Sequence, residues 1–152
     1  MKKLLVLAAV IVAGIAANAA SFKWTAGNMY GTDSTAKWTN TVKLYAMVGD
    51  VKTLVDTATA ANGTVANKTF SSDALTGGNY YDFFFTIEDN GKTFTSQSVN
   101  VLAQALQTAT IGFGNMQSAT QNPSNWANVP EPTSGLLLLL GMAGLALKRK
   151  RA

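Results

Sequence analysis

The chain has 152 residues, a formal net charge of +4, and neither histidine nor cysteine. Without these two residue types it cannot form a serine–histidine or cysteine–histidine relay, an imidazole or thiolate metal site, or a disulfide. The length leaves room for one domain with a processing segment at each end. We therefore expect a protein that is not an enzyme.

The positive charge is concentrated at the two ends of the chain. Of the 12 Lys and Arg residues, 2 precede Leu4 and 4 follow Leu147, which leaves 6 lysines to balance 8 acidic residues in between. The central part therefore has a net charge of −2, and it contains no arginine for bidentate contacts to phosphates or base edges. We predict no nucleic-acid partner.

The N-terminus has the three parts of a secretory signal peptide. Residues 1–3 carry two lysines, residues 4–17 are apolar, and Ala17-Asn18-Ala19 has small side chains at both positions that a signal peptidase reads. We predict that residues 1–19 are a signal peptide and that cleavage follows Ala19. The alternative is an N-terminal membrane anchor.

Between the ends, short segments with a two-residue hydrophobic period alternate with turn signals. Seven segments have the pattern of strands: 22–24, 41–48, 51–56, 64–70, 79–88, 92–102 and 109–113. Gly49-Asp50 and Asn90-Gly91 predict tight hairpins between neighbouring strands. This pattern predicts an all-β fold, a single antiparallel β-sandwich of about seven strands over residues 20–116, immunoglobulin- or fibronectin-like in architecture.

Three segments do not have a strand pattern. Residues 31–37 form a polar loop between Tyr30 and Trp38. Residues 57–61 are too short for a stable helix and are predicted to be a loop or a single turn. Residues 117–128, rich in Asn and Ser with one Pro, are predicted to be an exposed linker.

The hairpin at residues 90–91 raises a question of register. A two-residue turn sets Ile87 opposite Phe94, but an unbroken ladder would then set Phe83 opposite a serine. Phe94 and Val99 are an odd number of residues apart, so a regular strand points them to opposite faces. We predict a β-bulge between residues 95 and 98, which puts Val99 opposite Phe83. The alternative is an unbroken ladder in a sheet that is covered on both faces.

The acidic side chains of the body do not predict a catalytic or metal site. Asp82 and Glu88 share one face of a strand, but six residues at about 3.3 Å each put them roughly 20 Å apart, too far for a glycosidase pair. Asp89-Asn90-Gly91 is the closest grouping of oxygen ligands for calcium, and a hairpin turn already explains it. We therefore predict no catalytic residue, no metal and no cofactor.

Aromatic side chains provide one candidate binding site. Tyr30 and Trp38, on either side of the polar loop, are the residues that we expect to stack on a sugar if the domain binds carbohydrate. The alternative is that these rings belong to the core or its rim, as aromatic side chains in sandwiches usually do.

The C-terminus consists of three parts in direct succession. Val129, Pro130, Glu131 and Pro132 come first, and the two prolines predict extended, exposed backbone that a protease could bind. Residues 135–147 carry no charge and predict a transmembrane helix. A helix of this length covers roughly 20 Å, and snorkelling side chains at its ends extend it toward the ~30 Å hydrocarbon core.

A basic tail of Lys148, Arg149, Lys150 and Arg151 ends the chain one residue before its terminus. By the positive-inside rule these cations stay in the cytoplasm, so the domain lies on the other side of the membrane. A permanent membrane anchor and a buried core helix are the alternatives for this segment, although a core helix would have a polar face.

Residues 129–152 resemble the PEP-CTERM sorting signal of exported bacterial proteins, although this tail mixes lysine with arginine where the family is Arg-rich. The resemblance implies an exosortase, a membrane enzyme that would recognise Pro130-Glu131-Pro132, remove the hydrophobic tail, and release or attach the protein outside the cell. Proteins with this signal are associated with bacteria that make extracellular polysaccharide.

We therefore expect an exported protein that is membrane-anchored as a precursor and later lies at the cell surface or in the extracellular matrix. Its expected role is structural or one of interaction with other molecules, and its expected partners are the exosortase-type enzyme and, before processing, the membrane. A second hypothesis is a carbohydrate-binding module whose exposed tryptophan and tyrosine side chains bind exopolysaccharide.

Overall fold

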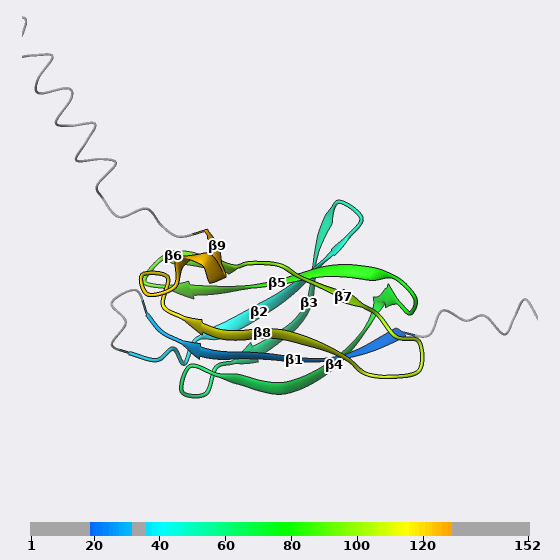
Figure 1. Cartoon of the computed structure of the whole chain (residues 1–152), viewed down its shortest axis with the longest axis horizontal. Helices are drawn as coiled ribbons and strands as arrows, with labels where there is room; N and C mark the ends of the chain where they lie inside the picture. The colour runs from blue at the N-terminus through cyan, green and yellow to red at the C-terminus, as the bar shows by residue number, and fades with distance from the viewer. Residues whose placement is uncertain (1–18, 32–35, 129–152) are drawn as a thin grey trace, which may run out of the picture.

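The computed structural model describes residues 19–31 and 36–128. These residues form nine strands and one 3₁₀ turn. In chain order the elements are β1 (Ala19–Met29), β2 (Thr41–Val48), β3 (Val51–Thr59), β4 (Val65–Thr76), β5 (Tyr80–Asp89), β6 (Lys92–Ser96), β7 (Val99–Leu102), β8 (Ala109–Gln117), η1 (Pro123–Asn125) and β9 (Trp126–Asn128). The predicted all-β class is confirmed (Figure 1). No helix within the described ranges is long and apolar enough to cross a membrane, and the predicted transmembrane helix lies outside those ranges.

The strands form two sheets. The smaller has the order β4-β1-β8, and the larger has the order β3-β2-β5-β6-β9, with β7 also paired to β5. All pairs are antiparallel except β1 with β8, which is parallel. The prediction of a purely antiparallel fold was therefore wrong for this pair. Parallel neighbours need a long crossover, and here the whole chain between β1 and β8 provides it.

Aromatic side chains from both sheets meet in one core. In β1, every second residue from Ala20 to Ala26 is buried, which is the alternation expected of a strand with one face on a core. The ring centroids of Phe22 in β1 and Phe83 in β5 are 5.1 Å apart. Those of Phe85 in β5 and Phe113 in β8 are 4.8 Å apart and nearly perpendicular. The two sheets therefore pack face to face.

A carboxylate links the two sheets at one edge. In β3, Val55 is an extra residue between the pairs formed with Leu44 and its neighbour, so the strand bulges and Asp56 shares the inward face with Leu44. The Asp56 Oδ2 atom accepts a 2.8 Å hydrogen bond from Nε1 of the buried Trp24 in the other sheet. Lys68 of β4 lies 4.0 Å from the other carboxylate oxygen. The indole N–H of a core tryptophan is thus satisfied across the sheets.

The predicted turns are confirmed. Gly49 has φ +60° between β2 and β3, and Val48 pairs with Val51 across it. Asn90 and Gly91 have φ +48° and +75°, and Asp89 pairs with Lys92, as a type I′ hairpin requires.

The predicted change of register after this hairpin is also confirmed. Ile87 pairs with Phe94, but Phe83 pairs with Val99, so the chain from Phe94 to Val99 contains one residue more than the stretch of β5 from Phe83 to Ile87 that it opposes. At the irregularity, the buried Ser96 hydroxyl accepts a 3.0 Å hydrogen bond from the backbone N–H of Phe85. The Ser96 hydroxyl thus takes the place of the backbone carbonyl that would accept the Phe85 N–H in a regular ladder. Beyond the bulge, Val99 packs against the core.

Several strands are longer than predicted. The segment 57–61, predicted to be a loop or single turn, instead continues β3 as far as Thr59. The strand predicted at 64–70 continues to Thr76, and the one predicted at 109–113 continues to Gln117. The extensions of β3 and β4 are rich in Thr, Ser and Ala, and none of the three has a clear hydrophobic alternation, so pairing with a neighbouring strand determines their conformation rather than local sequence.

Candidate functional site

The sorting segment that begins at Val129 lies outside the described residues, but the structure shows where it leaves the fold. β9 ends at Asn128 and pairs with β6, with Thr95 opposite Asn128 and Ser96 opposite Trp126. The Trp126 ring is 2% exposed and packs against Trp38 and other aromatic rings of the large sheet. The chain is therefore held to the domain until the residue before the sorting motif.

The prediction of an exposed linker at residues 117–128 is contradicted by this part of the structure. Ser118, Ala119 and Trp126 are buried, and the segment contains η1 and β9. The Asn125 side chain donates hydrogen bonds of 2.9 and 3.2 Å to the carbonyls of Asn115 and Met116 at the free edge of β8. The polar composition that predicted a linker instead provides side chains that satisfy backbone groups.

At the other end, Ala19 is the first described residue, and the predicted cleavage residue Ala17 lies outside the described ranges. β1 begins at Ala19 itself, and Ala20 is fully buried. Cleavage after Ala19 would thus place the new N-terminus at the start of the pairing between β1 and β4, where Ala20 lies opposite Ser72. Signal-peptide cleavage remains a prediction.

The two residues predicted to stack on sugar do not form an exposed platform. Trp38 is 4% exposed, and its Nε1 atom donates a 3.0 Å hydrogen bond to Oδ2 of Asp89. Its ring packs against Phe94, with centroids 5.1 Å apart. The prediction was wrong for Trp38, because its neighbours bury the ring faces that a sugar would need. Tyr30 is half-buried, and the Lys37 ammonium lies 5.7 Å from its ring centroid.

Other aromatic rings lie on the outer face of the large sheet. Tyr45 of β2 pairs with Phe84 of β5, and their rings stack with centroids 5.5 Å apart at 15°. The Lys52 ammonium lies 4.0 Å from the Tyr45 centroid and 5.2 Å from the Phe84 centroid. Leu54, which is 51% exposed, lies opposite Tyr45 on β3. Three neighbouring strands thus contribute one apolar row.

Sequence reasoning missed this row, although its alternation was visible. The alternation in 79–88 points Phe84 away from the core, and the alternation in 41–48 does the same for Tyr45. What the sequence did not provide was the register between these two strands, which are far apart in the chain. Only the pairing of β2 with β5 brings the two rings together.

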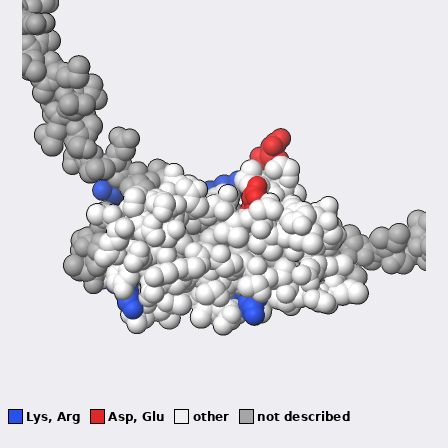
Figure 2. All heavy atoms as spheres, viewed as in Figure 1, with Lys and Arg blue, Asp and Glu red and all other residues white. Residues whose placement is uncertain are grey.

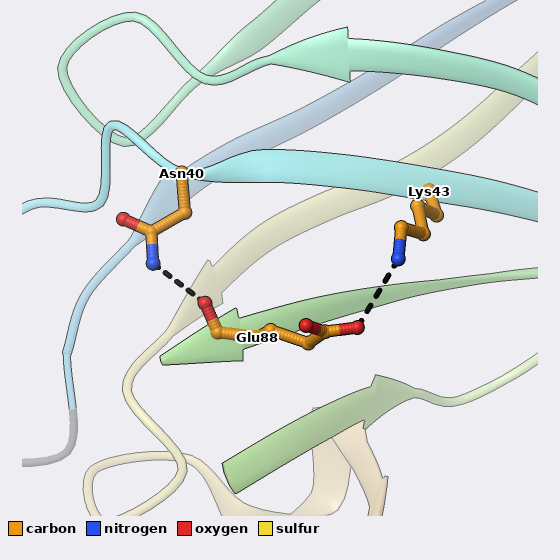
Figure 3. A network of polar contacts seen from close by, with 3 residues as sticks. All are labelled: Asn40, Lys43 and Glu88. Atoms are coloured by element: carbon orange, nitrogen blue, oxygen red, sulfur yellow. Dashed lines mark hydrogen bonds and ion pairs between the residues drawn. The ribbon is translucent and has the colours of Figure 1, made fainter. Parts of the chain in front are cut away.

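Polar side chains occupy the same face next to the apolar row. Lys43 donates a 3.1 Å hydrogen bond to Glu88 Oε1, and the Asn40 side chain donates a 2.7 Å hydrogen bond to the Glu88 carbonyl (Figure 3). The hydrogen bond and the charge of Glu88 raise the pKa of Lys43 above its ordinary value. A shallow depression of about 390 Å³ lies here, lined by Thr41, Lys43, Thr86 and Glu88.

The carboxylates on this face each have a separate partner. Asp82 Oδ1 accepts a 2.7 Å hydrogen bond from Asn100, and Glu88 is engaged by Lys43. Within the described ranges, no three His, Cys, Asp or Glu side chains gather closely enough to hold a metal ion. Asp89, considered for calcium, accepts the Trp38 indole hydrogen bond instead.

Two further depressions are open, and neither is lined by the stacked Tyr45–Phe84 pair. One, of about 790 Å³, lies at the edge where β3 and β4 meet, and threonines contribute much of its lining, including Thr41, Thr57, Thr59 and Thr64. Another, of about 400 Å³, lies beside Trp38, Asn40 and Asp89. Figure 2 shows a molecular face with few charged groups, so no large charged patch marks a site there.

Comparison with known proteins identifies the C-terminal segment. The family model of the PEP-CTERM protein-sorting motif matches residues 128–151. No curated protein and no solved structure matches the chain. The resemblance predicted from the tail is therefore confirmed. The chain carries a PEP-CTERM protein-sorting motif at its C-terminus, the signal of a protein that is sorted by an exosortase system.

Proposed function

We propose that this chain is the precursor of a β-sandwich protein that acts outside the cytoplasm in a structural or interaction role. The observation that carries the proposal is the PEP-CTERM motif at residues 128–151, which implies an exosortase-type processing enzyme and association with the membrane before processing. The signal-peptide pattern at residues 1–19 supports export independently. The final location is the cell surface or the extracellular matrix.

The position of the motif supports removal of the tail from a folded domain. The last strand ends at Asn128, and Pro130 follows two residues later. A cut at or after Pro130 removes none of the described core side chains, because the last of these is Trp126. The domain would therefore keep its packing when the hydrophobic segment is removed.

A non-catalytic role fits the chemistry of the domain. The chain has no histidine or cysteine, and the carboxylates on the outer face of the large sheet have separate partners. Its surface offers hydroxyl and amide groups on long strands, which suit contacts with other molecules. The second candidate function, carbohydrate binding, is favoured by the ring of Tyr80, which is 67% exposed on the outer face of the large sheet.

The proposal is tested by replacing Pro130, Glu131 and Pro132 with alanine in the full chain. We expect the altered precursor to keep its C-terminus and to accumulate in the membrane fraction, whereas the wild type loses its tail. Pro123→Ala is the matched control, because Pro123 is exposed, starts η1 and lies outside the motif. Equal processing of the triple variant and the wild type would contradict the proposal.

A further inference from the structure

We propose that β9 is a clasp on the sorting motif, and that it must leave β6 before an exosortase-type enzyme can bind the motif. The opening of β9 then limits how fast the tail is removed, and a precursor with β9 docked is protected from cleavage. This mechanism rests on the sorting function proposed above and names the part of the domain that controls access to the motif. After the cut, β9 returns to β6, because the processed chain keeps Trp126.

The sorting motif overlaps the last strand of the fold. The family model matches from residue 128, and Asn128 pairs with Thr95 of β6. Pro130 follows two residues later, and it lies within about 7 Å of the end of β9, since one extended residue spans at most about 3.6 Å. Packed layers of protein are about 10 Å apart. A wall of the enzyme that encloses Pro130 would therefore collide with β6 while β6 holds Asn128.

The chain offers little room on the other side of the motif. Residues 129–134 separate β9 from the uncharged segment 135–147, and six extended residues span at most about 21 Å. If the uncharged segment lies in a membrane, this length must cross a headgroup layer of roughly 5–8 Å and also fill the binding cleft of the enzyme. Release of residues 126–128 from β6 adds about 10 Å of free chain.

The attachment of β9 consists of few backbone contacts. The strand has three residues at the edge of the large sheet, and it pairs with β6 through Trp126 and Asn128, with an irregularity between the two pairs (Figure 1). Gln97 adds two hydrogen bonds: its backbone N–H donates to the Asn125 carbonyl at 2.9 Å, and its side-chain amide donates to the Trp126 carbonyl at 3.3 Å. A short terminal segment held in this way opens locally while the rest of a sheet stays folded.

The Trp126 side chain anchors the clasp at the cost of one hydrogen bond. Its ring is 2% exposed and contacts the rings of Trp38, Phe85 and Phe94. Its indole N–H is buried and has no acceptor among the described residues. Water can bind this N–H when β9 is open, so opening recovers a hydrogen bond that docking leaves unmade. The docked state is therefore less favourable than the packing of the ring alone would make it.

A disulfide across the clasp tests the proposal in the full precursor. Thr95→Cys with Asn128→Cys places two thiols at opposed positions of an antiparallel pair, where Cα separations of about 4.5–5.5 Å suit a disulfide. The natural chain has no cysteine, so no other bridge competes. In a pulse-chase we expect the oxidised double variant to lose its tail at least tenfold more slowly than either single variant, and dithiothreitol to restore cleavage. Equal rates for the oxidised double variant and the single variants would overturn the proposal.

A second disulfide is the matched control. Val48→Cys with Val51→Cys bridges opposed residues beside the turn between β2 and β3, two strands of the same sheet that do not pair with β9. This variant should lose its tail at the wild-type rate. A maleimide coupled to polyethylene glycol measures the oxidised fraction of each pair on a gel, and tail loss is scored on oxidised molecules. If the control bridge slowed processing as much as the bridge across the clasp, the special role of β9 would be refuted.

Loosening the clasp from the β6 side should have the opposite effect. Gln97→Ala removes the hydrogen bond to the Trp126 carbonyl and leaves the motif unchanged. Because cleavage of a transiently opened segment follows its open population, tail loss should become roughly two- to tenfold faster. Gln107→Ala, in the exposed loop between β7 and β8, is the control and should leave the rate unchanged. A folded Gln97→Ala that is processed no faster than the wild type would contradict the proposal, whether or not the bridge forms.

Native-state hydrogen exchange reports the opening without the enzyme. In the processed protein recovered from culture, the amides of β9 should exchange much faster than those of β5, which lies in the middle of the large sheet. Exchange of both strands at one rate, through global unfolding, would show that β9 does not open by itself. A wild-type precursor that keeps its tail would instead contradict the sorting proposal, so the two failures are distinguishable.

Discussion

At the scale of single residues, Trp126 shows how the C-terminal segment is attached to the domain. Its ring packs edge-on against Trp38 and Phe85, with centroids 5.6 and 5.8 Å away. Among the described side chains, its indole N–H is buried without an acceptor. Packing therefore outweighs the cost of an unsatisfied donor, which is typically about 1–3 kcal/mol.

This balance predicts unequal losses of stability for two substitutions. Trp126→Ala removes the ring and should lower the free energy of unfolding by about 3–5 kcal/mol. Trp126→Phe keeps an aromatic ring and removes the unsatisfied N–H, so it should cost about 2 kcal/mol or less. Urea unfolding of both variants measures the difference, with Leu106→Ala as a surface control. Equal losses for the two variants would contradict this description of the site.

The Lys43–Glu88 pair makes a prediction about pH. Glu88 raises the pKa of Lys43 above 10.5, so the folded protein holds the lysine proton more tightly than the unfolded chain does. The stabilisation is fully present below pH 10.5 and is lost as the pH rises through the higher pKa of the folded state. A double-mutant cycle with Lys43→Met and Glu88→Gln should give a small favourable coupling near neutral pH that disappears in strong alkali. A coupling that grows with alkaline pH would refute the assignment.

At the scale of strands, local sequence predicted turns better than strand ends. Asn90-Gly91 requires positive φ at both positions, a steric property of two residues, and the turn forms where predicted. The end of β3 at Thr59 depends on pairing between Thr59 and Thr41, which no local pattern encodes. The same holds for β9, whose three residues form a strand only because β6 lies beside them.

Candidate binding residues depend on tertiary structure even more strongly. Tyr30 and Trp38 were chosen because they flank a polar loop, but Trp38 is buried by Phe94 and Trp126. Nothing in the loop sequence indicates that aromatic residues so distant in the chain would cover it. Conversely, Tyr45 and Phe84 have the alternation of outward residues, and only the strand register makes them neighbours.

The bulge between β6 and β7 gives a prediction at this scale. Deleting Ser98 removes the extra residue and gives an unbroken ladder in which Val99 still lies opposite Phe83 and Val101 opposite Tyr81, so both valines keep facing the core. Because no apolar side chain leaves the core, the deletion should cost no more than about one hydrogen bond, ~1 kcal/mol, such as that from Phe85 to Ser96.

Deletion of Leu106, in the exposed loop that follows β7, is the matched control and should cost a similarly small free energy of unfolding. Thermal unfolding monitored by circular dichroism compares the two deletions. A Ser98 deletion much less stable than the control would show that the fold requires the bulge itself and not only the inward register of the two valines.

At the scale of the whole molecule, the domain extends to the sorting motif without a flexible spacer. β9 is the edge strand of the large sheet beside β6, and the Asn125 side chain donates a hydrogen bond to the Asn115 carbonyl in β8. A chain that ends after Gln117 should therefore lose cooperative unfolding, whereas residues 19–128 should unfold in one transition in urea. A sharp transition of undiminished free energy in the shorter chain would show that residues 118–128 contribute nothing to the fold.

The central claim is that both ends are addresses removed from a folded β domain. It is tested most directly by the intact mass and terminal peptides of the protein recovered from the culture medium and the cell envelope. We predict a protein that begins at or near Ala20 and lacks residues 136–152. Soluble, exported protein that still ends in Arg151-Ala152 would contradict the account.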